Sequence, residues 1–401
     1  MIMIDEKVLI QKINEKKEIF VKNRRMFHRI PELGFEERKT TETICEKLSQ
    51  IGIEPIRLEP TGVVGYIGPD SEITIGLRAD IDGLSVKECT GLSFRSEHPG
   101  KMHACGHDGH IAGLLGAAEI LKEMEERLTV RVKLIFQPSE ENTLGAKKVM
   151  EQGVLDDVAM IFGLHLFSDM TTGVISVEEG PRMAQTDRFF IDFYGKGGHA
   201  GKPHQCVDAT VMAADFVMSV QTIVSREVDP AQGAVVTIGS LHSGTQYNVI
   251  SGKATVEGTC RSFSENVASH LKEAIEKRAG AIAEYYGGSV EVQYDYGSHP
   301  PVYNDEMFSK MIQSESQKLL EDRTFSHIPS MMLGEDFSWY QTKVPGVFAF
   351  VGCGNPQKEV YPNHHPHFDI DEEALSDAVA LHIAAVMAAM NFEAEKPEYN
   401  L

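Results

Sequence analysis

The chain has little positive charge, few cysteines and no obvious long apolar run. Its 38 lysines and arginines face 59 aspartates and glutamates, which gives a formal net charge of −21. Nucleic acid is therefore not expected as a partner, because phosphate binding needs a basic face. The six cysteines are scattered without a disulfide framework, which indicates reduced thiols and a cytoplasmic location. We see no signal peptide and no stretch apolar enough to span a bilayer, so no membrane partner is expected.

The composition is that of an ordinary globular protein. Hydrophobic residues make up 42% of the sequence and charged residues 24%. A chain of 401 residues is too long for one small core, so we expect two or three domains.

Strand and helix patterns alternate in the first part of the chain and again near its end. Strands are predicted at 73–80, within 130–142, at 158–166 and at 347–354. Helices are predicted at 5–27, 36–51, 111–126 and 371–390, the last of them amphipathic. This alternation predicts an α/β fold, with a mixed, mostly parallel sheet flanked by helices.

The middle of the chain has a different order of elements, β-α-β-β-α-β. The segments are 186–195, 205–225, 233–240, 252–262, 264–286 and 289–296. This order is the split βαβ, or ferredoxin-like, unit. Because it has its own apolar faces, we interpret it as an α+β domain, 185–296, inserted into a catalytic domain made of 1–184 and 297–401.

Metal-seeking side chains gather in KMHACGHDGH, residues 101–110, which holds three histidines, one cysteine and one aspartate. Other polar side chains follow predicted strands. Because neighbouring strand ends meet at one edge of an α/β sheet, we expect these groups to converge. The converging residues are Asp80, Asp82, Cys105, His107, Glu140, Glu141 and His165, joined by His364 from the segment before the last helix.

This set supplies a thiolate, three imidazoles and a carboxylate. It is richer than one tetrahedral site needs, and a structural zinc site would contain more cysteines. It fits two divalent metal ions with a position left for water. Zinc, manganese, cobalt and nickel all suit these ligands. Of the adjacent glutamates, one can bind metal while its neighbour acts on the water.

Other interpretations of these residues stay open at this point. Cys105 alone could be an ordinary buried residue, and Glu140–Glu141 alone a solvated pair. His103 and His110 are interpreted as orienting or structural residues, while His365 and His367 compete with His364 as ligand. A Cys105 nucleophile with His107 as its base would leave the remaining candidate ligands without a function.

Eight motifs, taken in order, resemble the M20 metallopeptidase family. They are LRADIDGL, MHACGHDGH, QPSEE, GLH, YGKGGHAGKPH, YNVI, LGEDF and YPNHHPHF. The resemblance is greatest to the amidohydrolase branch, which includes hippurate hydrolases, N-acyl-amino-acid deacylases and auxin-conjugate hydrolases. It implies a two-metal catalytic domain and an inserted lid that makes a homodimer or dimer-based oligomer.

The resemblance also implies a role for each residue of the catalytic domain. Glu140 matches the general base, and Asp82 matches an acid that orients a ligand. Asp80 stands where peptidase branches carry a ligand histidine, a role that passes here to His107. The implied metal ligands are Cys105, His107, Glu141, His165 and His364.

In the insertion the resemblance implies three residues that act on the substrate. His199 matches a lid histidine that reaches toward the scissile carbonyl, often from the partner subunit. Asn248 matches a substrate-binding asparagine. Arg261 is a candidate for the substrate carboxylate, with an ordinary strand-edge charge as the alternative.

The expected function is hydrolysis of N-acyl amino acids, of the aminoacylase or hippuricase type. Metal-activated water would attack the amide carbonyl, with Glu140 as general base. A dipeptidase or carboxypeptidase acting on small peptides is the alternative. A binding protein that had lost catalysis should lack the base or a ligand, and this sequence retains all of them. The acyl group, the amino acid and the metal are not readable from the sequence.

Overall fold

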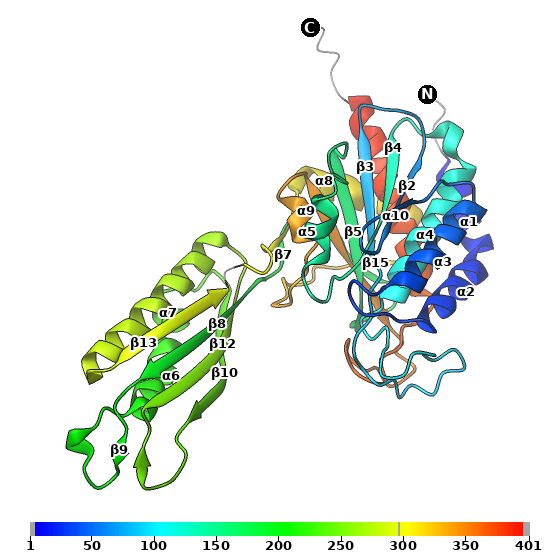
Figure 1. Cartoon of the computed structure of the whole chain (residues 1–401). Coiled ribbons are helices and arrows are strands. Elements are labelled where there is room, and N and C mark those ends of the chain that lie inside the picture. Colours follow the sequence, from blue (N-terminus) through cyan, green and yellow to red (C-terminus); the bar gives the residue numbers. More distant parts are fainter. Residues whose placement is uncertain (1–4, 296, 396–401) are drawn as a thin grey trace. The chain divides into compact units, whose positions relative to one another are not determined.

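The computed structural model describes residues 5–295 and 297–395, which divide into two compact units (Figure 1). The first comprises Met1–Gly180, Tyr303–Pro329 and Asp336–Leu401, and the second comprises Pro181–Val302 and Ser330–Glu335. Each unit has its own cluster of buried apolar residues. The second unit therefore takes in Ser330–Glu335, a segment that the sequence placed in the catalytic domain.

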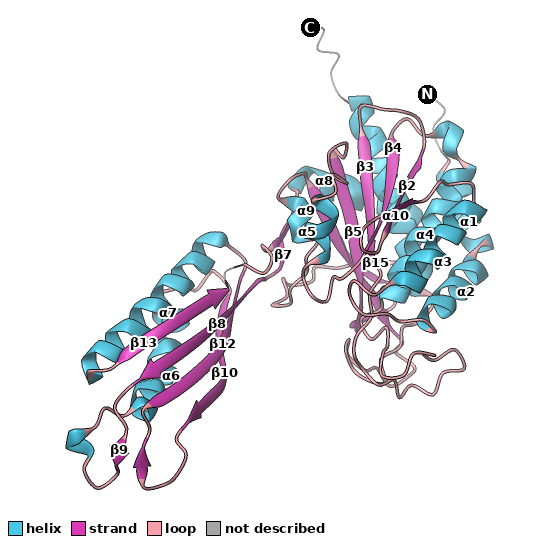
Figure 2. Ribbon diagram, viewed as in Figure 1, coloured by secondary structure: helices cyan, strands magenta, loops and turns pink. Residues whose placement is uncertain are grey.

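An eight-stranded mixed sheet forms the centre of the first unit (Figure 2). In sheet order the strands are β1 (Ile56–Arg57), β2 (Val63–Ile67), β4 (Arg131–Gln137), β3 (Thr74–Asp80), β5 (Met160–Thr171), β16 (Gly346–Gly354), β6 (Val174–Ser176) and β15 (Thr324–Phe325). The four central strands are parallel. The outer pairs β1–β2, β2–β4 and β6–β16 are antiparallel. The predicted mixed, mostly parallel α/β sheet is confirmed.

Helices cover this sheet. They are α1 (Glu6–Glu15), α2 (Lys17–His28), α3 (Arg38–Gln50), α4 (His107–Glu123), α5 (Gly145–Met150), α8 (Glu306–Leu319), α9 (Ser338–Gln341) and α10 (Ala374–Glu395), with a short 3₁₀ turn at Glu125–Arg127. Helices α4 and α10 pack against each other and against the central strands. Every residue of β3 and β16 is buried, which is typical of parallel strands covered on both faces.

Helix α10 differs from its prediction. It was expected at 371–390 with one polar face, but its residues are buried almost all round. Its segment Ala374–Glu393 is also long and apolar enough to cross a membrane, with a mean hydropathy of 1.5, so the expectation that no such stretch exists was wrong. Because 78% of that window is buried inside the protein, α10 is accounted for as a core helix.

The N-terminal helix predicted at 5–27 is divided at Lys16 into α1 and α2. The backbone of Lys16 has φ −101° and ψ 3°, and its N–H donates to the carbonyls of Lys12 and Ile13. No glycine or proline marks this break, which is why a continuous helical pattern hid it.

The second unit has the predicted β-α-β-β-α-β order. Its elements are β8 (Gln185–Tyr194), α6 (Ala209–Arg226), β10 (Ala234–Ser243), β12 (Lys253–Ser262), α7 (Glu265–Tyr286) and β13 (Ser289–Asp295). The sheet order is β10-β12-β8-β13, all antiparallel. Helices α6 and α7 pack together on this sheet (Figure 1). The inserted α+β unit of ferredoxin-like type is confirmed.

Four short strands complete the described structure. Strands β9 (Gly198–His199) and β11 (Val249–Ile250) pair with each other, as do β7 (Gly180–Met183) and β14 (Val302–Asn304). A 3₁₀ turn spans Pro203–Gln205.

Strands β3 and β5 separate toward their C-terminal ends. They pair only from Ile75–Met160 to Leu77–Phe162, although β3 continues to Asp80 and β5 to Thr171. The sequence predicted that the strand corresponding to β5 ends at residue 166. Because β5 continues to Thr171, His165 lies further from the end of its strand than expected. Beyond the last pair, His110 bridges the two strands through Asp80 of β3 and Leu166 of β5, and the rings of His107 and His165 lie beside it.

Candidate metal centre

The five candidate ligands come from four segments of the first unit. Cys105 and His107 flank Gly106, whose φ of +89° is readily adopted only by glycine. His107 is the first residue of α4, so it lies in a helical turn and not in the predicted loop. Glu141 follows β4, His165 lies in β5, and His364 precedes α10.

The donor atoms of these residues lie within a few ångströms of one another. Cys105 Sγ is 3.3 Å from His165 Nε2 and 3.2 Å from His364 Nε2. Glu141 Oε1 is 3.4 Å from His364 Nε2 and 3.8 Å from His107 Nε2. The structure therefore brings all five predicted ligands together around one region.

Hydrogen bonds fix the two histidine rings that point into this region. His107 Nδ1 donates to the carbonyl oxygen of Asp82 at 2.9 Å, and His165 Nδ1 donates to that of Leu166 at 3.0 Å. Because a carbonyl only accepts, each ring carries a proton on Nδ1 and turns its Nε2 toward the other ligands.

Two buried atoms of the cluster have no hydrogen-bond partner among the described residues. They are His107 Nε2 and Glu141 Oε1. An unpaired buried polar atom costs about 1–3 kcal/mol, and one metal ion can bind both atoms once Nε2 has released its proton. Together with the thiol and imidazole donors, this arrangement fits divalent metal ions.

Asp82 contacts two of the candidate ligands. Its Oδ1 lies 3.2 Å from His107 Nδ1, and its Oδ2 accepts a hydrogen bond from the Glu141 backbone N–H at 3.1 Å. The buried carboxylate thus links α4 to the segment after β4, and the orienting role expected for it stays a prediction.

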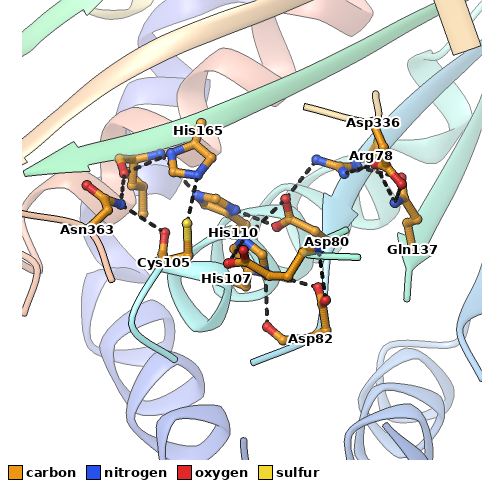
Figure 3. Close-up of polar contacts among 12 residues, drawn as sticks. Arg78, Asp80, Asp82, Cys105, His107, His110, Gln137, His165, Asp336 and Asn363 are labelled. Atoms are coloured by element: carbon orange, nitrogen blue, oxygen red, sulfur yellow. Dashed lines mark hydrogen bonds and ion pairs between the residues drawn. The ribbon is translucent and has the colours of Figure 1, made fainter. Parts of the chain in front are cut away.

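Asp80 and His110 are both fully engaged in hydrogen bonds (Figure 3). Asp80 Oδ1 accepts from His110 Nδ1 at 2.5 Å, and its Oδ2 accepts from Arg78 Nη1 at 2.8 Å. His110 Nε2 accepts from the Leu166 backbone N–H at 3.0 Å. Since neither nitrogen of His110 is left for a metal, His110 bridges β3 to β5 where the two strands separate.

Behind Asp80 lies a buried network that sequence reasoning did not find. Asp336, within the LGEDF motif, accepts hydrogen bonds from Arg78 Nη2 at 3.2 Å, Gln137 Nε2 at 2.8 Å and the Ala146 N–H at 2.9 Å. Burial raises the pKa of Asp336 to about 6, although these donors oppose the shift. The acidic residue in LGEDF was a sequence signal for a functional position. The three groups that bind it lie far from it in the sequence, and only the folded chain brings them together.

The loop that carries Glu140 is held by a second buried carboxylate. Glu37 accepts hydrogen bonds from the Ser139 backbone N–H at 2.8 Å and from Thr61 Oγ1 at 2.7 Å. Ser139 has a φ of +56°, a conformation that a non-glycine residue adopts only when its surroundings hold it. Glu140 itself is buried, and a carboxylate oxygen lies within 4.8 Å of ligand atoms of His107 and Glu141.

The electrostatics of the cluster favour cations. Burial alone would lower the pKa of His107, but the charges of Asp80 and Asp82 outweigh it and raise that pKa to about 10, so a metal ion bound at His107 would replace the proton on Nε2. Burial, and then the neighbouring imidazole of His110, lowers the pKa of His165, which keeps the His165 ring neutral as a metal ligand must be.

Cys105 is a poor nucleophile in this setting. Burial, followed by the charges of Glu141, Glu140 and Asp80, raises the pKa of its thiol well above its ordinary value. A reactive cysteine needs the opposite shift. Bound cations would stabilise the thiolate, so the environment suits a ligand better than a covalent catalyst.

The two histidines that compete with His364 lie outside this cluster. The ring of His365 stacks on that of Tyr361 with centroids 4.6 Å apart, and the ring of His367 contacts the same tyrosine in a tilted arrangement at 5.1 Å. His364 is the histidine whose Nε2 contacts Cys105.

In the second unit the structure brings His199 and Asn248 together. His199 pairs with Val249 between β9 and β11, and the Asn248 carbonyl accepts from the Ala200 N–H at 3.1 Å. Both residues are exposed. Asn248 precedes Lys253, the first residue of β12, whereas Arg261 lies near the last residue of that strand. At a rise of about 3.3 Å per residue, Arg261 is roughly 26 Å along the strand from Lys253. It is half-buried, and its Nη1 donates to Thr259 Oγ1 at 3.0 Å.

Comparison with known proteins gives extensive similarity. The sequence profile of Peptidase family M20/M25/M40 matches residues 76–388. The chain is 39% identical over 366 residues to IAA-amino acid hydrolase ILR1-like 4 of Arabidopsis thaliana, covering 90% of this chain and 83% of that one. It is 40% identical over 358 residues to N-acetyl-L-cysteine deacetylase of Bacillus subtilis, covering 88% and 84%.

Two further relatives bear on the function. Thermostable carboxypeptidase 1 of Saccharolobus solfataricus is 36% identical over 386 residues, covering 93% of this chain and 97% of that one. Among solved structures, the Bacillus subtilis YXEP protein is described as a dinuclear metal-binding peptidase. It superposes with a TM-score of 0.82 at 36% identity and covers 95% of this chain and 99% of that one.

Proposed function

This chain belongs to the M20/M25/M40 peptidase family, in its amidohydrolase branch, and from that premise we propose that it hydrolyses N-acyl amino acids. As a member of this branch it is a metal-dependent amidohydrolase that acts on amide bonds. The observation that carries the proposal is the convergence of five ligand side chains on one region beside the carboxylate of Glu140.

The substrate class is supported by what the relatives act on. An N-acetylcysteine and an indole-acetyl amino acid share one chemical unit, an acyl group joined by an amide to an amino acid. The carboxypeptidase relative supports the second candidate, cleavage of the last peptide bond of a short peptide. Both substrates present an amide next to a free carboxylate.

Two divalent ions are proposed as the cofactor, with zinc, manganese, cobalt and nickel as candidates. Cys105, His107, Glu141, His165 and His364 would hold them, with Asp82 orienting His107 and Glu141. When bound, such ions lower the pKa of water and polarise a carbonyl oxygen. This chemistry suits an amide, whose carbonyl is a weak electrophile.

Glu140 would act as the general base. It takes the proton from the attacking water and returns it to the leaving amine, so the products are a free amino acid and a carboxylic acid. In the second unit, His199 would stabilise the negative charge that develops on the carbonyl oxygen. Asn248 would bind the substrate, and Arg261 its carboxylate.

We further propose a homodimer formed through the second unit, in a cytoplasmic protein. Strand β10 is an edge strand of its sheet, and the adjacent helix α6 exposes Met218 (73%) and Val211 (44%). Exposed apolar residues beside an unpaired strand edge favour association with a second copy.

The proposed cytoplasmic location is supported by the six free cysteines, which agree with a reducing compartment.

Metal analysis combined with a substrate panel tests this function. Purified protein should contain up to two divalent ions per chain, and chelation should abolish hydrolysis of N-acetyl amino acids and hippurate. Turnover of dipeptides at a higher kcat/KM than N-acyl amino acids would favour the second candidate. Chelated protein that still cleaved N-acyl amino acids at the full rate would exclude the metal-dependent mechanism.

A further inference from the structure

One side-chain amide connects the segments of three candidate ligands. Asn363 immediately precedes His364, and its Nδ2 donates to the carbonyl oxygens of Cys105 and Leu166, both at 3.2 Å (Figure 3). Leu166 is the residue after His165. A single NH₂ group therefore joins the chain at Cys105, the chain beside His165 and the chain that carries His364.

The orientation of this amide is determined by its partners. The Oδ1 atom of Asn363 lies 3.4 Å from the backbone nitrogen of Ser168, which can donate to it. The Ser168 hydroxyl, also 3.4 Å away, donates instead to the Tyr361 carbonyl at 2.8 Å. Rotating the amide by half a turn would place Oδ1 against two carbonyl oxygens, with no proton between them. The two Nδ2 protons are thus committed to Cys105 and Leu166.

The backbone N–H and carbonyl of Leu166 each form a hydrogen bond with a histidine of the site. Its N–H donates to His110 Nε2 at 3.0 Å, and its carbonyl accepts from His165 Nδ1 at 3.0 Å as well as from Asn363. Because the bond to Leu166 sets the direction of the His165 ring, any displacement of this peptide also displaces His165 Nε2.

His364 needs support of this kind. Its φ is +70°, a region that a non-glycine residue adopts only when its surroundings hold it there. Its backbone N–H donates to the Ala104 carbonyl at 2.7 Å. This bond and the one from Asn363 Nδ2 to the Cys105 carbonyl lie side by side, so they pair the His364 segment with the Cys105 segment.

We propose that Asn363 is a positioning residue of the metal centre, which holds Cys105, His165 and His364 in register through its two N–H donors. The proposal rests on the proposed function, since it concerns the same metal site. It assigns Asn363 no contact with substrate. Its effect is on metal affinity, which can be measured without turnover.

Titration of the metal-free protein with Co²⁺ tests this role. The absorption band from the Cys105 thiolate to cobalt reports ligation directly. Asn363→Leu, which removes both donors at similar size, should weaken Co²⁺ binding about 10–100-fold, the usual effect of losing a group that orients ligands. Ser168→Ala is the matched control, because it removes a hydroxyl that lies 3.4 Å from the same amide and leaves both amide donors in place.

The metal-free stability of each variant separates positioning from general loop damage. We expect Asn363→Leu to change the urea midpoint no more than Ser168→Ala does, while only the former weakens Co²⁺ binding. If Asn363→Leu does not fold, Asn363→Asp serves instead, since it keeps the size and loses both N–H donors, and the same weakening is expected.

Two outcomes would overturn the role of Asn363 alone. These are wild-type affinity and absorption in the Asn363 variants, or an equal loss of affinity in Ser168→Ala. A wild-type protein that bound no Co²⁺ through its thiolate would instead overturn the proposed metal centre, and the role of Asn363 with it.

Discussion

The backbone carbonyl of Asp82 accepts a hydrogen bond from His107 Nδ1 at 2.9 Å, and the carboxylate of the same residue lies 3.2 Å from that nitrogen. Two oxygens of one residue therefore hold one ring nitrogen. This leaves His107 a single orientation, with Nε2 toward Glu141. The relationship leads to a prediction about metal affinity.

Replacing Asp82 by asparagine should weaken divalent metal binding about 10–100-fold. The substitution removes the negative charge beside His107 and turns an amide donor toward either His107 Nδ1 or the Glu141 N–H, both of which are donors themselves. Isothermal titration of the metal-free variant with Zn²⁺ measures the effect. Asp70→Asn, at an exposed site, is the control and should bind as the wild type does.

Replacing Glu140 by glutamine should lower kcat about 10²–10⁴-fold, the usual contribution of a general base. Metal content and thermal stability should be nearly unchanged, because the amide keeps the size of the side chain. Steady-state hydrolysis of an N-acetyl amino acid and metal analysis of the same sample check this. Glu126→Gln, on an exposed turn, should be fully active. A loss of metal that paralleled the loss of rate would make Glu140 a ligand and contradict its role as base.

Sequence patterns predicted much of the fold because its elements are regular. All six elements of the inserted unit were found with boundaries within a few residues, since turns that contain glycine separate most of them. Strands β6 and β15 were missed because two or three residues carry no measurable periodicity. The break at Lys16 was missed because no residue type signals it.

The ligand candidates were readable because cysteine and histidine are rare and the motifs keep their order. Their supports were not readable. Asn363 contacts Cys105 across 258 positions, and Glu37 contacts Ser139 across 102. From the sequence alone, an asparagine or a glutamate is interpreted as an ordinary surface residue. Only the folded structure shows which groups these side chains contact. The separation of β3 from β5, which opens the site, likewise depends on strand pairing.

Replacing Glu37 by glutamine should change how stability depends on pH. Burial, with a smaller contribution from Asp82, raises the pKa of Glu37 from 4.5 to about 7, although Thr61 and Ser139 oppose the shift. The folded protein therefore binds more protons than the unfolded chain between these values, and stability falls as pH rises from 4.5 through 7. Because glutamine does not titrate, Glu37→Gln should not lose stability in this way as pH rises. Its amide oxygen can still accept a hydrogen bond from the Ser139 N–H.

Urea unfolding of the metal-free protein measures the difference. Relative to wild type, Glu37→Gln should gain roughly 2–3 kcal/mol between pH 4.5 and pH 7.5, at about 1.4 kcal/mol per pKa unit. The adjacent, exposed Glu36 provides the control, and Glu36→Gln should show no such gain. A constant difference between wild type and Glu37→Gln at all pH values would mean that Glu37 is already ionised in the folded protein below pH 5.

Replacing His382 by leucine should stabilise the first unit. His382 is buried in α10, and neither ring nitrogen has a hydrogen-bond partner among the described residues. Its ring meets that of Phe162 edge to face, with centroids 5.4 Å apart. Removing an unpaired buried polar group should add about 1–3 kcal/mol to the free energy of unfolding, and leucine fills a similar volume in an apolar site.

The stability gained by His382→Leu should also depend on pH. It should increase as pH falls, whereas the stability gained by Glu37→Gln should increase as pH rises. Burial, and then the neighbouring imidazole of His110, lowers the pKa of His382 from 6.5 to about 3. The unfolded chain therefore binds more protons than the folded protein below pH 6.5, and the wild type loses stability as pH falls. The advantage of His382→Leu should then grow between pH 7.5 and pH 5, by about 1.4 kcal/mol per unit below 6.5. Urea midpoints at the two pH values measure this, and a variant less stable than wild type at both would show that the imidazole has a buried partner, such as an ordered water.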